Sequence, residues 1–250
     1  MFRLDGKVAL VTGVGGGIGQ ALTLVLADAG ADIAGVYRSQ YEETKNRVER
    51  SGRRFVPVKA DLQKIDMNNS SEIISRIIDE LDGLDILVNC AGIIHHSKAE
   101  NLEKRHWDEI LQVDLTAIFF LSQAAATVMI PRGGGKIINI TSLLSYQGGI
   151  CVSAYTVAKS AVAGVTRALA NEWASQGINV NAIVPGYIET ELTISLRDDF
   201  QRNKEILTRI PAGRWGVLDD LKKTFLFIVA AASNCVYGML IPVDGGWLSR

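Results

Sequence analysis

Residues 7–19 read KVALVTGVGGGIG, a short apolar run that passes directly into a turn holding five glycines. Apolar residues at helical spacing follow from Gln20 to Ala29, so this part of the sequence predicts a strand over 7–12, a turn and a helix. Glycine lets the backbone turn sharply and lets phosphate oxygens approach the amides at the positive end of a helix. No Gly-Lys-Ser/Thr follows, which excludes the P-loop type of phosphate site. The sequence therefore predicts a nucleotide-binding loop, and its candidate residues are Gly13, Gly17, Ile18 and Gly19.

The alternation of strand and helix continues along the chain. Further strands are predicted over 32–37, 55–59, 84–89, 136–141, 179–184 and 240–243. Helices are predicted over 41–50, 71–81, 104–129 and 154–175, with a helical pair around 200–207 and 219–231. Strand sequences such as DILVN and KIINI are apolar on both faces, as expected when helices cover both sides of a parallel sheet. We therefore expect one α/β domain over residues 1–250, with a doubly wound parallel sheet and a ligand cleft at the carboxyl ends of its strands.

Composition limits the classes of protein and partner. The chain has 250 residues, of which 48% are apolar and 21% charged, and its net charge is −1. This balance suits one soluble globular domain and gives no electrostatic footprint for nucleic acid or an anionic membrane. The most lipid-like stretch, residues 117–130, is too short and too polar to span a bilayer, and no secretory signal is visible, so we expect a cytoplasmic protein. The three cysteines lack disulfide or metal-ligand spacing, so no metal site is expected.

Residues after the second and third predicted strands bear on the choice of cofactor. Folds that bind NAD usually place an acidic residue at the end of the second strand, against the ribose hydroxyl. This chain has Arg38 there, and a guanidinium can pair with the 2′-phosphate of NADP. NADP is therefore favoured over NAD, and both stay open at this point. Asp61 and Leu62, just past the third strand, are placed to flank the adenine.

A tyrosine and a lysine four residues apart, Tyr155 and Lys159, lie on one face of a predicted helix. An ammonium favours phenolate, so we expect it to lower the tyrosine pKa from about 10 toward the range where the phenol exchanges a proton near neutral pH. The preceding strand ends beside Ser142, whose hydroxyl reaches the same end of the sheet and can hydrogen-bond a substrate oxygen. Tyr41 and Lys45 have the same spacing, but they lie near the end of the second strand, away from this reaction centre.

Together these motifs resemble the classical short-chain dehydrogenase/reductases over essentially the whole chain. The matching motifs are TGVGGGIG at 12–19, NCAG at 89–92, Ser142, YTVAK at 155–159 and PG at 185–186. The resemblance implies an NAD(P)-dependent oxidoreductase with a single-domain Rossmann fold, in which seven parallel strands have the order 3-2-1-4-5-6-7. It also implies a homotetramer, formed through the long helices that contain Leu115 and Val162.

The resemblance implies a role for individual residues. Tyr155 is expected to be the acid/base, Ser142 to position and polarise the reacting oxygen, and Lys159 to perturb the tyrosine pKa and bind the nicotinamide ribose. Residues 187–216 are expected to form a lid over the substrate. Cofactor contacts are implied for Asn89, Ala91, Gly92, Tyr155, Lys159, Pro185, Gly186, Ile188 and Thr190.

Position 114 departs from the family pattern. The family usually has an asparagine there, whose main-chain carbonyl holds a water of the proton relay, whereas this chain has Asp114. A main-chain role survives the exchange, so Asp114 stays among the candidate catalytic residues. An added carboxylate near Lys159 is expected to alter the pKa balance, and so to reduce activity or move its pH optimum.

Longer segments are similar to a sugar-acid branch of the family, the 2-dehydro-3-deoxy-D-gluconate 5-dehydrogenases. These segments are GRRF, ADLQKID, KIINITSLLSYQGGI, NEWA, NVNAIVPGYIET, RIPAGRWG and VDGGWLSR. The resemblance implies a small sugar acid as substrate. Those relatives have two arginines after the NCAG motif that can clamp a carboxylate. This chain has His95 and His96 there, which are candidate substrate-binding residues, although neutral imidazoles bind an anion less firmly. Gluconate 5-dehydrogenase activity, an uncharged ketose or polyol substrate, and a non-catalytic dinucleotide-sensing protein therefore stay open.

Overall fold

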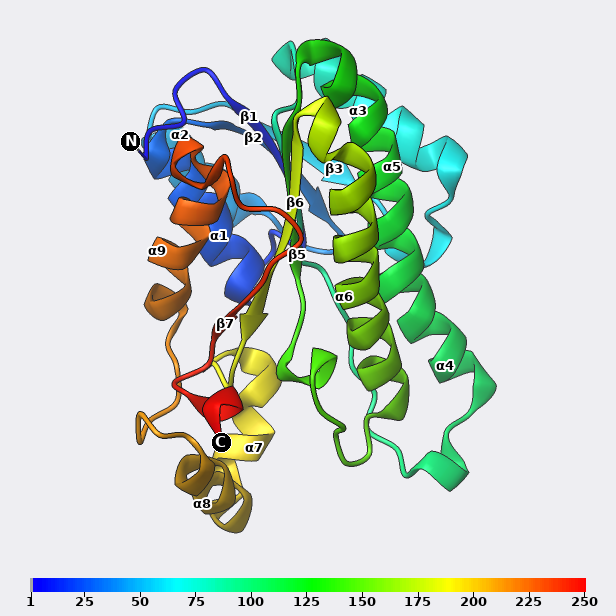
Figure 1. Ribbon diagram of the computed structural model, residues 1–250, viewed down its shortest axis with the longest axis vertical. Coiled ribbons are helices and arrows are strands. Elements are labelled where there is room, and N and C mark those ends of the chain that lie inside the picture. Colours follow the sequence, from blue (N-terminus) through cyan, green and yellow to red (C-terminus); the bar gives the residue numbers. More distant parts are fainter. Residues whose placement is uncertain (1) are drawn as a thin grey trace.

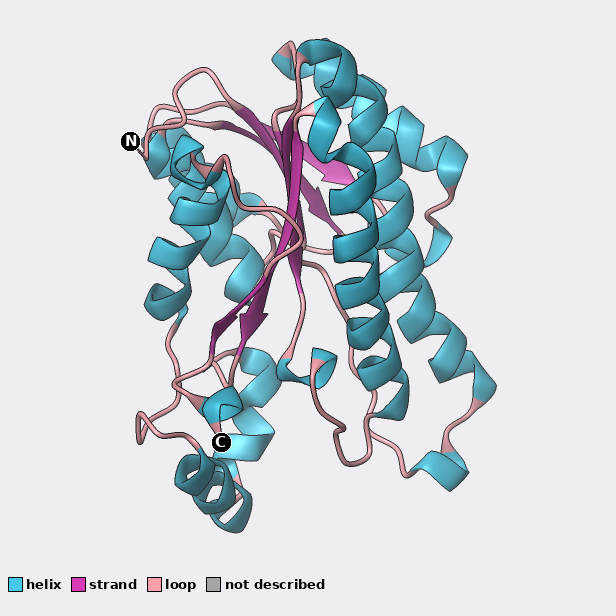
Figure 2. Ribbon diagram, viewed as in Figure 1, coloured by secondary structure: helices cyan, strands magenta, loops and turns pink. Residues whose placement is uncertain are grey.

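The computed structural model describes residues 2–250 and contains one sheet of seven parallel strands between two layers of helices (Figures 1 and 2). The strand order is β3-β2-β1-β4-β5-β6-β7, which confirms the predicted Rossmann topology. The order reverses between β1 and β4, and ligands bind at such switch points in open α/β sheets. The strands are β1 (Val8–Thr12), β2 (Asp32–Tyr37), β3 (Phe55–Lys59), β4 (Ile86–Asn89), β5 (Gly135–Ile140), β6 (Ile178–Pro185) and β7 (Leu240–Val243).

Helices cover both faces of the sheet. In Figure 1, α1 (Gly17–Ala29), α2 (Glu42–Arg50) and α9 (Leu218–Val229) form one layer. The other layer holds α3 (Met67–Leu81), α4 (Lys104–Leu111), α5 (Ala117–Met129) and α6 (Ser153–Trp173). Each layer packs an apolar cluster against the sheet. Strands such as β1 and β6 are buried along their whole length, as expected for strands that helices cover on both faces.

Helix α3 begins at Met67, four residues before the predicted start, because its first turn is capped. The Asp66 carboxylate accepts hydrogen bonds from the backbone N–H groups of Asn68 and Asn69, at 2.8 and 3.0 Å. The Asn69 side chain accepts in return from the backbone N–H of Asp66, at 2.8 Å. This reciprocal arrangement satisfies amides that a helix start leaves unpaired, and so extends the helix beyond its apolar face.

Helices α4 and α5 are continuous through residues 112–116, which form one π-helical turn. The whole helix, Lys104–Arg132, is long and apolar enough by composition to cross a membrane. It is instead a core helix here, because Leu121, Ala125 and Met129 are buried in the layer between the sheet and α3. The sequence predicts the helix but not the π turn.

Residues 187–216 leave the sheet after β6 and carry α7 (Ile194–Asp198) and α8 (Phe200–Arg209), of which α7 is not predicted from the sequence. The two ends of this segment are joined, because the Gly216 N–H donates to the Tyr187 carbonyl and the Glu189 N–H donates to the Gly216 carbonyl, both at 2.8 Å. Near this junction, the Arg214 guanidinium binds both carboxylate oxygens of Asp220, at 2.7 and 2.9 Å. The segment therefore projects from a fixed base.

Candidate active site

A cleft of about 1430 Å³ lies at the carboxyl ends of the strands, between the glycine-rich loop and the segment 187–216. Most of the predicted site residues line it, but Asn89, His95 and Asp114 do not. The cleft-lining members are Gly13, Gly17, Ile18, Gly19, Arg38, Asp61, Leu62, Ala91, Gly92, His96, Ser142, Tyr155, Lys159, Pro185, Gly186, Ile188 and Thr190.

The glycine-rich loop fits the diphosphate of a dinucleotide. Gly13 has a φ of 79°, a backbone conformation that favours glycine, and a Cβ on Gly19 would collide with the carbonyl oxygen of Gly13. No side chain caps the first turn of α1, so its amides stay available to an anion at the positive end of the helix. A Cβ on Gly15 would lie 2.6 Å from the Gln40 carbonyl oxygen, so this wall of the loop also requires glycine.

Arg38 stands on the far wall of the cleft, where β2 ends. Its side chain is exposed, and it forms no ion pair with any carboxylate in residues 2–250. Asp61 lies on the same wall and accepts the backbone N–H of Gln63 at 3.1 Å. A 2′-phosphate on a bound dinucleotide could therefore meet a free guanidinium at this end.

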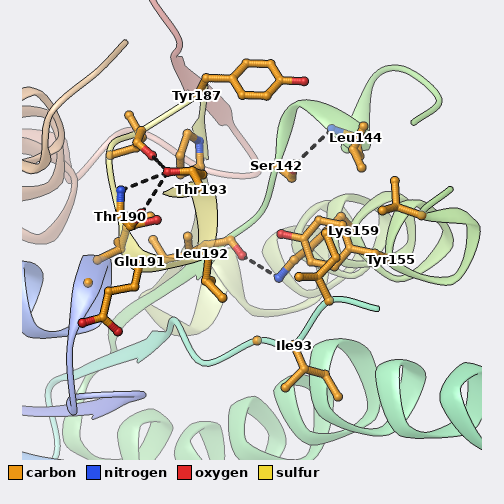
Figure 3. Close-up of a pocket in the computed structure, with 18 of the residues that line it drawn as sticks. Ile93, Ser142, Leu144, Tyr155, Lys159, Tyr187, Thr190, Glu191, Leu192 and Thr193 are labelled. Atoms are coloured by element: carbon orange, nitrogen blue, oxygen red, sulfur yellow. Dashed lines mark hydrogen bonds between the residues drawn. The ribbon is translucent and has the colours of Figure 1, made fainter. Parts of the chain in front are cut away.

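Ser142, Tyr155 and Lys159 gather on one side of the cleft (Figure 3). Tyr155 and Lys159 are one turn apart on α6, and the Lys159 Nζ lies 5.3 Å from the centroid of the tyrosine ring. The Lys159 ammonium donates to the Ile140 carbonyl at 3.2 Å, which ties α6 to the end of β5. Ser142 follows that strand, and its hydroxyl accepts the N–H of Leu144 at 3.2 Å.

Asp114 lies behind this group, on the π turn between α4 and α5. Its side chain is fully buried, and its Oδ2 lies 3.0 Å from the Lys159 Nζ. The two atoms form an ion pair rather than a well-aligned hydrogen bond, while the other oxygen, Oδ1, accepts the N–H of Ile93 at 2.8 Å. Gly92 leaves room for the carboxylate, since a Cβ there would lie 2.8 Å from Oδ2. The carboxylate therefore contacts Lys159 from behind and does not line the cleft itself.

The electrostatics of the group differ from the sequence prediction. Burial raises the pKa of Tyr155 above its ordinary value; the Lys159 charge lowers it, and the Asp114 carboxylate raises it again. Burial alone would lower the pKa of Lys159, but Asp114 and Tyr155 raise it above its ordinary value. The predicted lowering of the Tyr155 pKa is therefore wrong. Burial and the Asp114 charge together raise this pKa by more than the Lys159 charge lowers it.

Two predicted contact residues lie elsewhere. Asn89 is buried, and its amide donates to Ser122 at 3.1 Å and to Asn139 at 2.9 Å, so it links β4 to neighbouring elements beneath the cleft. The His95 ring stacks on His106 with their centroids 3.7 Å apart, away from the cleft. The predicted pair of histidines facing a substrate is therefore not formed, and only His96 lines the cleft.

The sequence did not identify several side chains that line the cleft on the side of α8 and the C-terminal turn. Arg202, Lys204 and Arg209 of α8 line it together with Gln147 and Trp247. The sequence placed the three basic residues in the expected lid, residues 187–216, but did not indicate which side chains face inward. Nothing in the spacing indicates that the C-terminal turn packs against α8, because that contact depends on how the chain folds.

Comparisons with known proteins agree with this geometry. The family model described as short chain dehydrogenase matches residues 7–201. The 2-dehydro-3-deoxy-D-gluconate 5-dehydrogenase of Bacillus subtilis (strain 168) is 52% identical over 100% of this chain and 97% of its own. A solved structure from Agrobacterium tumefaciens, assigned as a 2-deoxy-D-gluconate 3-dehydrogenase with bound NADP, is 46% identical with a TM-score of 0.92, covering 100% of this chain and 99% of that one. A gluconate 5-dehydrogenase from Burkholderia cenocepacia J2315, in complex with NADP and tartrate, is 38% identical with a TM-score of 0.94 and covers 100% and 98%. The predicted family is confirmed: the chain belongs to the short-chain dehydrogenases.

Proposed function

We propose that this protein transfers a hydride between NAD(P) and a secondary alcohol or ketone of a small sugar acid, as a 2-dehydro-3-deoxy-D-gluconate 5-dehydrogenase does. The observation that carries the proposal is the meeting of Ser142, Tyr155 and Lys159 at one end of a cleft whose other end fits a dinucleotide. The relatives named above support the substrate class, since their names refer to gluconate derivatives.

Each residue of the group has a distinct task in the proposed reaction. The bound nicotinamide supplies or accepts the hydride. The Ser142 hydroxyl holds the reacting oxygen of the substrate beside the Tyr155 phenol. Tyr155 takes the proton from that oxygen in oxidation and returns it in reduction. Lys159, positively charged and anchored to Ile140, favours the phenolate and binds the nicotinamide ribose. Asp114 holds Lys159 from behind.

The cofactor is proposed to lie across the carboxyl ends of the strands. The amides of Gly17, Ile18 and Gly19 bind the diphosphate, with Gly13 giving the close approach. Arg38 favours NADP, and the two related structures named above contain NADP. Asp61 and Leu62 flank the adenine. The remaining proposed contacts are Ala91, Gly92, Pro185, Gly186, Ile188 and Thr190, with Asn89 acting beneath them.

Residues 187–216 are proposed to close over the substrate as a lid, because their ends are fixed and the part between them lines the cleft. We also propose a homotetramer formed through α5 and α6. An apolar groove of about 380 Å³ lies between these helices and is lined in part by Phe119, Ile130 and Trp173. A cytoplasmic location completes the proposal.

The test is the absorbance of reduced nicotinamide in the presence of a panel of sugar acids, ketoses and polyols with each cofactor. We expect turnover with a sugar acid and a preference for NADP. The second candidate, a non-catalytic dinucleotide sensor, draws on the buried Asp114 and the raised pKa of Tyr155. Tight cofactor binding without turnover of any compound, at neutral and at alkaline pH, would favour that sensor and overturn the enzyme.

A further inference from the structure

We propose that Arg209, held against Trp247 at the end of α8, binds the carboxylate of the substrate and so selects acids over their uncharged counterparts. The inference rests on the proposed function, because it concerns the same cleft and the same substrate class. It assigns to the lid the carboxylate-binding role that the resemblance gives to two arginines in the relatives, at the positions of His95 and His96 here.

Three basic side chains of α8 line the cleft, and they differ in what holds them. Arg202 is paired with Glu205, at 3.0 Å, so its charge is already compensated. Lys204 is exposed, and no side-chain hydrogen bond or ion pair fixes it among the described residues. The Arg209 guanidinium carbon lies 4.0 Å from the centroid of the Trp247 ring. Arg209 is therefore the one of these three that is both oriented and, within residues 2–250, without a carboxylate partner.

Trp247 holds the Arg209 guanidinium on the side of the cleft that carries Ser142. Its side chain is only 4% exposed, and its indole N–H donates to the Gln147 side chain at 3.1 Å. Gln147 lines the cleft and belongs to the loop that begins at Ser142. The Trp247 ring also packs against Tyr187, with the ring centroids 4.8 Å apart. Arg209 is thus connected to the Ser142 loop through two successive contacts.

The stacked arrangement suits a carboxylate ligand. A guanidinium lying on an aromatic face keeps its N–H edge free, and that edge matches the two oxygens of a carboxylate. Packing on the indole also limits the side-chain freedom that binding would otherwise remove. The carboxylates of the lid also favour an anion at Arg209 over the other end of the lid. Glu191 lies near the Thr190 end of the lid (Figure 3) and repels an anion there, whereas Glu205 is neutralised by Arg202.

The experiment compares Arg209→Gln with Lys204→Gln, a matched loss of positive charge on the same helix and cleft. Initial rates are measured at saturating cofactor with the sugar acid that the wild type turns over and with its methyl ester. Loss of a charge-assisted pair predicts a rise in KM for the acid of roughly 10- to 100-fold in Arg209→Gln, with a much smaller change in kcat. KM for the ester and for the cofactor should be unchanged. Lys204→Gln should stay within about twofold of wild type for both substrates.

A second variant, Arg209→Lys, keeps the charge but loses the planar edge, and we expect an intermediate KM for the acid. A wild-type KM for the acid in Arg209→Gln would overturn the inference, as would an equal rise for acid and ester, which would indicate a packing role. An equal effect of Lys204→Gln would also overturn it. Failure of the proposed function is distinct from these outcomes, because it shows in the wild type. There, either no compound is turned over, or ketoses or polyols are turned over and no acid is.

Discussion

The carboxylate of Asp114 lies 3.0 Å from the ammonium of Lys159, and both side chains are buried. Asp114 lies on the π turn at 112–116, between α4 and α5. In the family pattern this position holds a neutral asparagine. Here a full negative charge offsets part of the positive charge that acts on Tyr155, and it contributes to the raised pKa of the tyrosine.

The first prediction concerns this pair and the pH dependence of oxidation, which in the proposed mechanism needs the Tyr155 phenolate. Because the Asp114 charge raises the pKa of Tyr155, replacing it by the isosteric amide in Asp114→Asn should lower that pKa. The pH at which kcat/KM for oxidation reaches half its maximum should then move to lower pH, by about one unit. The measurement is the pH–rate profile of both proteins.

Asp108→Asn is the matched control, since Asp108 is on the same continuous helix but is exposed and pairs with Lys104. Its profile should coincide with that of the wild type. A profile of Asp114→Asn that does not move, in a variant that still folds and binds cofactor, would show that the carboxylate has no influence on the acid/base.

The sequence predicted the framework of this site well, because its main signals are local. The glycine-rich loop, the Tyr155–Lys159 spacing and the doubly covered strands depend on residues near one another in the chain, and each appears where the pattern placed it. The π turn was missed because one extra residue per turn hardly disturbs an apolar pattern. The stacking of His95 on His106 was missed because it depends on a tertiary contact that spacing does not encode.

The second prediction tests Arg38 as the group that distinguishes the two cofactors. Arg38→Gln removes the one cation at the end of β2 that a 2′-phosphate would meet. We expect KM for NADP to rise by roughly 10- to 100-fold, while KM for NAD changes little. Arg50→Gln, at the exposed end of α2 and away from the cleft, should change neither value. Equal losses for NADP and NAD in Arg38→Gln would contradict a contact with the phosphate.

The third prediction separates the chemical role of Tyr155 from cofactor binding. Tyr155→Phe keeps the ring beside Lys159 and removes only the hydroxyl to which the proposed proton exchange is assigned. We expect kcat to fall by roughly 100- to 10,000-fold, the range for loss of a general acid/base, with an unchanged Kd for NADPH from its fluorescence on binding. Turnover close to wild type would remove Tyr155 from the acid/base role, whatever its position.

The last prediction uses two glycines of one loop to test why the turn needs glycine. A Cβ on Gly19 would collide with the Gly13 carbonyl oxygen, a backbone atom that moves only if the whole turn moves. A Cβ on Gly16 meets no atom within 4 Å, and its φ of 174° is extended backbone that any residue adopts. Gly19→Ala should therefore lower the free energy of unfolding in urea by about 2 kcal/mol, the cost of forcing a methyl into a packed site. Gly16→Ala should change it by less than about 1 kcal/mol, since only a weak cap preference is altered. Equal stability of the two variants would mean that the turn relaxes around the new methyl, and that close backbone approach is not what holds glycine at position 19.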